Sequence, residues 1–199
     1  MPDGWELLSL GALCESISKT HSYNKDELIF LNTGDIANGL FLHASYSPVS
    51  HMPGQAKKSI QRNDILYSEI RPINRHFAYV NFDAPDYIVS TKLMVLRVSG
   101  IDSRRLYHYL TSEDVISKLQ AEAESRSGTF PQIRFENIQQ MDILIATPDI
   151  EEKFSAILHD TYDMIDYNNA ESARLATLRD ALLPRLMSGE LSVADADAK

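Results

Sequence analysis

The stretch that decides the fold is residues 148–188, which read PDIEEKFSAILHDTYDMIDYNNAESARLATLRDALLPRLMS. A proline followed by acidic side chains stands at its start, as is typical of the first turn of a helix. Glycine does not recur until Gly189, and Pro184 is the only helix breaker inside the stretch. The pattern therefore predicts one long helix over residues 149–188.

Apolar residues recur along this helix at alternating spacings of four and three, which places them on one face. The seam consists of Ile150, Phe154, Ile157, Thr161, Met164, Asn168, Glu171, Leu175, Leu178 and Leu182. It is apolar at both ends and polar in the middle. About 35 residues of helix rise about 52 Å, whereas a domain of roughly 150 residues is little more than 30 Å across. Part of the helix is therefore expected to project beyond its own domain.

A projecting apolar face needs a partner, and a second copy of the chain is one candidate. In an antiparallel pair the midpoints of the two helices meet, so Asn168 would face its own counterpart or lie close to it. A buried asparagine fixes the register of such a pair at some cost in stability. The expected dimer-interface residues are Phe154, Ile157, Leu158, Met164, Ile165, Asn168, Leu175, Leu178 and Leu182. The alternative is that the helix folds back on its own domain.

The first 147 residues show a different pattern, in which short apolar runs alternate with turn residues. The runs that predict strands are residues 28–31, 64–67, 77–82, 92–98 and 143–146. Residues 103–123 are predicted to form two short helices, with Ser112 as the cap of the second. The chain is therefore predicted to be α+β, a mixed α/β globular part followed by a long C-terminal helix that forms an antiparallel coiled coil in a dimer.

The chain of 199 residues has 44% hydrophobic and 24% charged side chains, a composition typical of globular proteins. Its net charge of −9 argues against a nucleic-acid partner for the chain taken as a whole. The charge is unevenly distributed, since residues 1–50, 51–135 and 136–199 carry −4, +3 and −8. Because a surface field acts within a Debye length of about 8 Å, a phosphate-binding face on residues 51–135 is compatible with the total charge.

The motifs of common enzymes are missing from the sequence. The six histidines show no His-x-His or His-Glu-x-x-His spacing, and no serine lies in a Gly-x-Ser-x-Gly elbow. No glycine-rich phosphate loop is present, so we expect no cofactor, no metal and no catalytic residue. The carboxylates of Asp149, Glu151 and Glu152 fall within about one helical turn, unlike the converging ligands of a metal-dependent nuclease. We interpret them as the charge cluster of a helix N-terminus.

The single cysteine, Cys14, excludes an internal disulfide bond and fits a reducing compartment. No apolar run reaches the length of a membrane span, and the first residues lack the pattern of a signal peptide. We therefore expect a cytoplasmic chain without a membrane partner.

Several polar side chains in the middle of the chain suit nucleic acid. Residues 71–76, RPINRH, follow a predicted strand and offer arginine, which can grip guanine, and asparagine, which can grip adenine. The expected base contacts are Arg71, Asn74, Arg75 and Gln132. The expected phosphate contacts, on loops that a partner can reach, are Lys57, Lys58, Arg62, Arg126, Ser127 and Thr129. Taken alone, each of these groups of polar residues is explained equally well as an exposed turn that binds no partner.

Six short motifs occur in order along residues 4–193. They are Gly4-Trp5-Glu6, Asn32-Thr33-Gly34-Asp35-Ile36, Asp64-Ile65-Leu66-Tyr67-Ser68 with Arg71-Pro72-Ile73, Ser127-Gly128-Thr129-Phe130-Pro131-Gln132-Ile133, Thr147-Pro148 with Glu151-Glu152-Lys153-Phe154, and the stretch 178–191. Together they resemble the specificity subunit of type I restriction–modification systems. The chain departs from the family pattern at Ile73-Asn74, which follows a single proline where the family often has Pro-Pro-Ile-Gly.

The resemblance implies a half-size subunit with a single target-recognition domain over residues 1–147. A long helix over residues 148–191 would serve dimerisation, spacing and subunit docking, and residues 192–199 would be a flexible acidic tail. Such a subunit would bind double-stranded DNA at one half-site of a bipartite target. It would position modification subunits, which supply the adenine methyltransferase, and a restriction subunit, without catalysis of its own.

Two rival interpretations remain open at this point. One is a coiled-coil adaptor with no role in DNA binding, which the net charge of −9 favours. The other is a small hydrolase, whose signature would be a buried cleft with a converging Asp/His pair.

Overall fold

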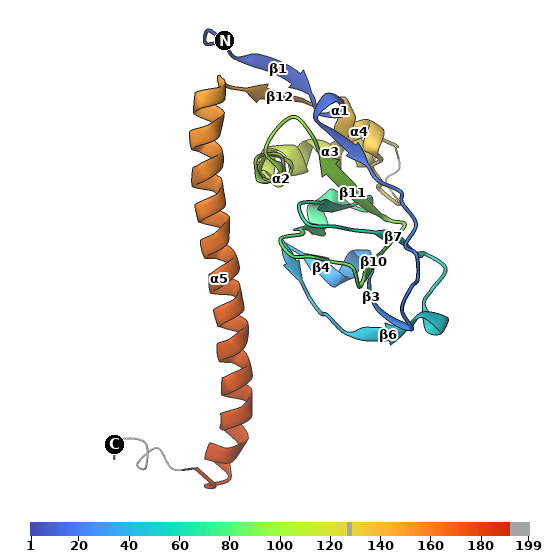
Figure 1. Cartoon of the computed structure of the whole chain (residues 1–199), viewed down its shortest axis with the longest axis vertical. Coiled ribbons are helices and arrows are strands. Elements are labelled where there is room, and N and C mark those ends of the chain that lie inside the picture. The colour runs from blue at the N-terminus through green and yellow to red at the C-terminus, as the bar shows by residue number, and fades with distance from the viewer. Residues whose placement is uncertain (127–128, 192–199) are drawn as a thin grey trace. The chain divides into compact units, whose positions relative to one another are not determined.

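The computed structural model describes residues 1–126 and 129–191 (Figure 1). The chain divides into two compact units, Met1–Ser155 and the residues from Ala156 onward. The first unit holds the described strands and the shorter helices, and the second holds most of one long helix. Ser127 and the expected acidic tail lie outside the described residues. Within the described ranges, no helix combines the length and the hydropathy that a bilayer crossing requires.

Two four-stranded sheets form the centre of the first unit. One has the order β6-β3-β10-β7 and consists of β3 (Glu27–Leu31), β6 (Tyr46–Pro48), β7 (Ala56–Ser59) and β10 (Tyr87–Ser90). The other has the order β2-β11-β8-β9 and consists of β2 (Cys14–Ser16), β8 (Ile65–Ser68), β9 (Phe77–Tyr79) and β11 (Leu93–Val98). Strand β10 leads into β11 through Thr91 and Lys92, so the two sheets are linked at this point.

Smaller elements complete the first unit. They are α1 (Leu10–Leu13), the one-turn helices η1 (Thr33–Asp35), η2 (Val49–His51) and η3 (Pro72–Asn74), the paired strands β4 (Ile36–Ala37) and β5 (Leu40–Phe41), and α4 (Phe135–Gln139). A separate antiparallel ribbon pairs β1 (Glu6–Ser9) with β12 (Asp142–Ile145). The ribbon therefore joins the start of the chain to the segment that precedes the long helix (Figure 1).

Each of the five predicted strands is present, as β3, β8, β9, β11 and β12, with ends that differ by a few residues. Helices α2 (Ser103–Leu110) and α3 (Glu113–Arg126) confirm the two short helices predicted over residues 103–123. Asp102 caps α2, since its carboxylate accepts a hydrogen bond from the backbone of Arg105 at 3.0 Å. Ser112 precedes α3, but its hydroxyl donates to the carbonyl of Tyr109 at 2.8 Å, so the predicted side-chain cap does not form.

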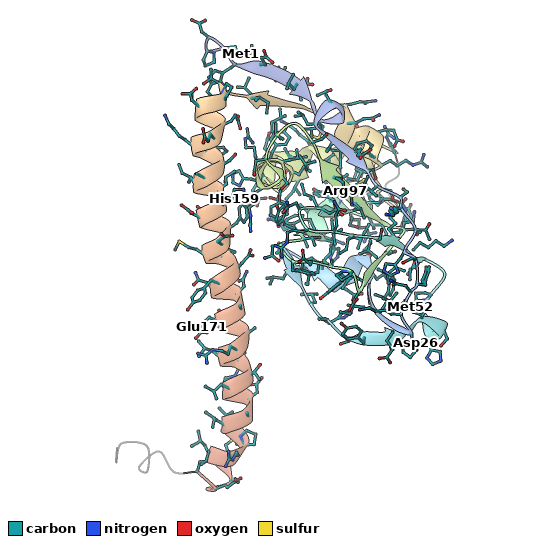
Figure 2. The ribbon with its side chains drawn as sticks, viewed as in Figure 1. Met1, Asp26, Met52, Arg97, His159 and Glu171 are labelled. Carbon is teal, nitrogen blue, oxygen red and sulfur yellow. The ribbon has the colours of Figure 1, made fainter. Side chains whose placement is uncertain are left out.

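Aliphatic side chains from both sheets form the core of the first unit, and a few charged side chains, among them Asp64, are buried in the same unit. Asp64, at the start of β8, is 1% exposed. Its two carboxylate oxygens accept hydrogen bonds from Nε and Nη2 of Arg97 on β11, each at 2.9 Å. Figure 2 labels Arg97 within this unit. The bidentate pair ties β8 to β11.

Helix α5 (Pro148–Met187) has 40 residues and confirms the long helix predicted from the sequence. Its first turn begins at Thr147, whose carbonyl accepts hydrogen bonds from the backbone of Ile150 and Glu151. The helix passes through Pro184 and continues to its last residue. At 1.5 Å per residue, a helix of this length rises about 60 Å.

Candidate nucleic-acid interface

The structure brings together the two segments from which base contacts are predicted. Ile70 and Gln132 form an isolated antiparallel bridge. The N–H of Arg71 donates to the carbonyl of Pro131 at 3.1 Å, and the N–H of Ile133 donates to the carbonyl of Glu69 at 2.8 Å. Backbone hydrogen bonds therefore join the end of β8 to the segment before α4, although the two lie far apart in the sequence.

The one-turn helix η3 follows β8, and the residues on either side of it have left-handed backbone conformations. Arg71 has a φ of 43°, and Arg75 has a φ of 55°. This region costs a residue with a side chain about 1 kcal/mol or more, so the surrounding bonds must hold the turn in place. Pro72 is buried at the start of η3, and Ile73 and Asn74 are exposed on it.

Helix α3 holds this turn from one side. Both carboxylate oxygens of Glu113 lie 2.6 Å from Nη2 of Arg75. Oε1 of Gln120 accepts a hydrogen bond from the N–H of Ile73 at 3.2 Å. The guanidinium of Arg75 is thus already engaged by a carboxylate of the protein, which competes with the base contact expected of it.

The other predicted base-contact residues have more freedom. The guanidinium of Arg71 makes one long hydrogen bond, from Nη2 to the carbonyl of Thr129 at 3.5 Å, and has no carboxylate partner in the described part of the chain. The exposed side chain of Asn74 makes no hydrogen bond to any described residue. Gln132 is half-buried at the bridge. Arg71 and Asn74 can therefore hydrogen-bond to a partner without first breaking an ion pair.

A depression beside this turn is lined by Arg126, Phe130, Gln132 and Arg134. Arg134 is a residue that the sequence argument missed. It is exposed and has no carboxylate partner within residues 1–126 and 129–191. Its spacing of two from Gln132 could have indicated it, because residues two apart in an extended segment share one face. Arg126, by contrast, pairs with Glu122 one turn earlier on α3, with Nη2 2.9 Å from the carboxylate.

The neighbouring lysines Lys57 and Lys58 lie on strand β7 and not on a loop, so their side chains point to opposite faces. Lys57 is exposed. Lys58 is 9% exposed, and its ammonium donates to the carbonyl of Leu93 at 2.8 Å. Burial lowers the pKa of Lys58. The strand turns this side chain into the fold, so the ammonium that we expected to contact a phosphate is bound to a backbone carbonyl in the structure.

The remaining phosphate-contact residues lie at the surface. Nε of Arg62 lies 3.0 Å from the carboxylate of Asp83, and Nη1 donates to the carbonyl of Asn81. An exposed ion pair of this kind stabilises little, so Arg62 can exchange its partner for a phosphate. Thr129 is exposed.

Three observations on the described residues bear on the hydrolase interpretation. No group of three or more metal-ligating side chains occurs among the described residues. Nε2 of His43 lies 3.5 Å from Oδ2 of Asp35, with 33% and 34% of the side chains exposed. This pair therefore lies at the surface and not in the buried cleft that the hydrolase interpretation requires. Burial raises the pKa of Cys14 to about 11, so its thiol is protonated at neutral pH.

Comparison with known families decides what kind of domain this is. The family model described as the type I restriction modification DNA specificity domain matches residues 2–177. The chain belongs to this family. The resemblance drawn from the six ordered motifs is confirmed.

Curated relatives of this specificity domain include subunits from two organisms. The type I restriction enzyme HindI specificity subunit of Haemophilus influenzae is 38% identical over 181 residues, which are 89% of this chain and 39% of the relative. The MjaIX specificity subunit of Methanocaldococcus jannaschii is 20% identical over 202 residues, which are 98% of this chain and 46% of the relative. The specificity domain thus spans less than half of the length of these relatives.

Solved structures show the same fold. The HsdS subunit from Thermoanaerobacter tengcongensis superposes with a TM-score of 0.68 at 18% identity, over 92% of this chain and 48% of that one. A chain from a structure of the assembly and conformational transition of the type I R-M system gives a TM-score of 0.66 at 19% identity, over 94% of this chain and 49% of that one. The predicted mixed α/β domain followed by a long helix is therefore confirmed as the architecture of specificity subunits.

The residues expected at the dimer interface on the specificity domain's long helix differ in exposure. Phe154 belongs to the first unit, where the guanidinium of Arg105 lies 5.2 Å from the centre of its ring. Leu158 is 6% exposed. Most of the other apolar residues expected at the interface are exposed, namely Ile157, Met164, Ile165, Leu175 and Leu178. Leu182 is half-buried, and Asn168 is exposed near the middle of the helix.

Proposed function

We propose that this chain reads one half-site of a double-stranded DNA target as part of a type I restriction–modification complex. One observation carries the proposal, namely the backbone link between the end of β8 and the segment before α4. It brings the segment that carries Arg71 and Asn74 next to the segment that carries Gln132 and Arg134. Arginine and amide side chains are the groups that read guanine and adenine edges in the major groove.

The contacts fall into two classes. The proposed base contacts are Arg71, Asn74 and Gln132, and the proposed phosphate contacts are Lys57, Arg62, Arg126, Ser127, Thr129 and Arg134. Lys58 is left out because its ammonium is bound inside the fold. Arg75 is assigned a supporting role, because Glu113 already holds it against α3.

We propose that two copies of the chain pair through α5 in antiparallel fashion. Exposed apolar side chains on one face of a helix favour such pairing, since their burial stabilises the dimer. The polar middle of the seam supplies the register. If the two-fold axis passes between Asn168 and Glu171, these polar residues face each other and the other seam positions pair on both sides. The flanking layers would then be Met164 with Leu175, Thr161 with Leu178, and Ile157 with Leu182.

The partners follow from the family. The chain would hold modification subunits, which supply adenine methylation, and through them a restriction subunit, while contributing no catalytic residue itself. The carboxylates of Glu151 and Glu152 are proposed to dock the modification subunits, because carboxylates repel the phosphates of DNA. Chromosomal DNA as the substrate implies a cytoplasmic location.

Methylation mapping tests the proposal directly. The chain is expressed with its modification subunit, and adenine methylation is mapped across the host genome. We expect methylated adenines in two inverted half-sites separated by an unspecified gap. A complex that assembles but methylates no defined site would contradict the reading role and favour an adaptor. Reversing the charges of Glu151 and Glu152 should weaken assembly and leave DNA contacts intact.

A further inference from the structure

Ile73 is an exposed apolar side chain in the middle of the proposed reading surface. It lies on η3 with 50% of its surface exposed, and its chain neighbour is the exposed Asn74. Single exposed apolar residues are common on protein surfaces and need no explanation by themselves. Ile73 differs because its backbone is fixed at the tip of a turn.

Four contacts fix that turn. The N–H of Ile73 donates to Gln120 on α3, the N–H of Asn74 donates to the carbonyl of Arg71 at 2.8 Å, and the N–H of Arg75 donates to the carbonyl of Pro72 at 2.9 Å. The fourth contact is the ion pair between Arg75 and Glu113. Since these bonds order the turn before any partner arrives, binding through Ile73 costs little further ordering.

The chemistry of the two exposed neighbours matches one kind of base pair. In the major groove, adenine offers an acceptor and a donor that suit an amide side chain, and thymine offers a methyl group, the apolar group on its edge. We infer that Ile73 is a specificity-determining residue that packs against the C5 methyl of a thymine next to the adenine read by Asn74. Gln120 is the positioning residue that holds Ile73 there. The inference rests on the proposed function and adds the base that is read.

Deoxyuridine supplies the test, because it is thymidine without the C5 methyl. The assembled complex with its modification subunit is bound to duplexes that carry the mapped site, with each thymine in turn replaced by deoxyuridine. In each half-site, one thymine position should be sensitive. A single deoxyuridine at that position should weaken binding by the wild-type complex about fourfold, the loss expected for one buried methyl group. The same replacement should change binding by the Ile73→Ala complex by less than about 1.5-fold, because the side chain that contacts the methyl is gone.

Leu42→Ala is the matched control. Leu42 is also an exposed aliphatic residue of the first unit, at 57%, and it lies after β5 and outside the reading turn. This variant should lose the same fourfold as the wild type on deoxyuridine.

Three results would overturn the inference. The first is wild-type binding that no deoxyuridine weakens, and the second is an equal loss in the wild-type and Ile73→Ala complexes. The third is failure of Ile73→Ala to assemble with the modification subunit without DNA, which would make Ile73 a protein contact. Absence of any duplex binding by the wild-type complex would overturn the proposed function itself, and the inference with it.

The positioning role of Gln120 is tested by exchanging the side chains at positions 120 and 124, so that the hydrogen bond between them runs in the opposite direction. Nε2 of Gln120 donates to the carboxylate of Glu124 at 2.7 Å while its oxygen accepts from Ile73. Gln120→Met removes the acceptor and should reduce the deoxyuridine effect below twofold. The double variant Gln120→Glu/Glu124→Gln keeps both hydrogen bonds with the pair reversed and should restore the fourfold effect. Equal discrimination in all three proteins would show that Gln120 does not position Ile73.

Discussion

Arg71 combines a left-handed backbone, at a φ of 43°, with a guanidinium that lacks a carboxylate partner among the described residues. A side chain with such freedom, on the same turn as Asn74, suits the base contact that we propose for it. We expect Arg71→Ala to weaken binding of the cognate duplex by about 1–3 kcal/mol and to relax the preference at one base pair. Competition binding with single-base variants of the site measures both effects. Unchanged affinity and preference in the assembled complex would remove Arg71 from the base contacts.

Lys57 and Lys58 form a matched pair, because neighbours on β7 point to opposite faces. We expect Lys57→Ala to lower the slope of log affinity against log salt by about one unit without changing sequence preference. Lys58→Ala should leave the slope unchanged and lower the melting temperature, since Leu93 loses its hydrogen-bond donor. A salt titration of both variants measures the difference. A lower slope for Lys58→Ala would show that its ammonium does reach DNA.

Cys14 reports on the packing of the first unit. Its folded pKa of about 11 lies above the ordinary 9.0, because burial disfavours the thiolate. At pH 8 the folded thiolate fraction is therefore about a hundredfold lower than in the unfolded chain, and it rises only as the pH approaches the folded value. Alkylation by iodoacetamide at pH 8 should be slow in native protein and fast in urea. Equal rates would mean that Cys14 is not buried.

Single residues explain where sequence reasoning about the site succeeded and failed. The types and spacing within RPINRH indicated a reading turn, and the structure gives Arg71 and Asn74 exposed positions there. Pattern alone could not show that Glu113 holds Arg75, because that contact spans two elements. It also treated Lys58 as a loop residue, since consecutive lysines hide a strand from a search for apolar alternation.

At the scale of elements, the bidentate pair between buried Asp64 and half-buried Arg97 joins β8 to β11 and so supports the strand that leads to η3. Asp64→Ala leaves the guanidinium without its partner, and we expect the free energy of unfolding to fall by about 3 kcal/mol. Urea denaturation followed by circular dichroism measures this loss. Asp83→Ala, which removes the exposed partner of Arg62, is the control and should be close to wild type. Equal stability of both variants would show that the Asp64–Arg97 pair does not stabilise the fold.

Helix α5 allows a test of the seam. Leu175 and Leu178 are 49% and 50% exposed on it, and Glu171, which Arg174 binds and whose pKa it lowers, lies near the middle (Figure 2). Leu175→Asp with Leu178→Asp places two charges in the proposed apolar layers and should weaken the dimer at least tenfold. Ala170→Asp, off the seam, is the matched control. Sedimentation equilibrium of the wild type, the double variant and Ala170→Asp measures the dimer affinity of each. Equal affinities would show that the dimer interface does not include Leu175 and Leu178.

Elements also show how far the fold follows from local pattern. Helix α5 was predictable because the spacings of four and three recur from Ile150 to Leu182 and no glycine falls within this stretch. Strands β8 and β11 were predictable because both are apolar runs bounded by turns. Strands such as β2 and β7 are short and polar, and tertiary pairing alone makes them strands.

At the scale of the whole molecule, the dimer is the first property to measure. Sedimentation at micromolar concentration should give about twice the 22.4 kDa of the chain, because the proposed pairing would bury the exposed apolar side chains of the seam. The sedimentation experiment is done with the isolated chain and with the chain mixed with the modification subunit. A monomer at every concentration would reject pairing through α5.

The proposed pairing surface lies on α5, and the proposed reading residues lie around η3 and the segment before α4. In this proposal, dimerisation and recognition of the DNA sequence are therefore carried by different parts of the chain. Consider a cell that makes two chains with the same α5 but different target-recognition domains. Such chains would form heterodimers as readily as homodimers. Such hybrids would recognise asymmetric targets that neither parent marks, so a small set of genes would generate a larger set of methylation patterns by combination.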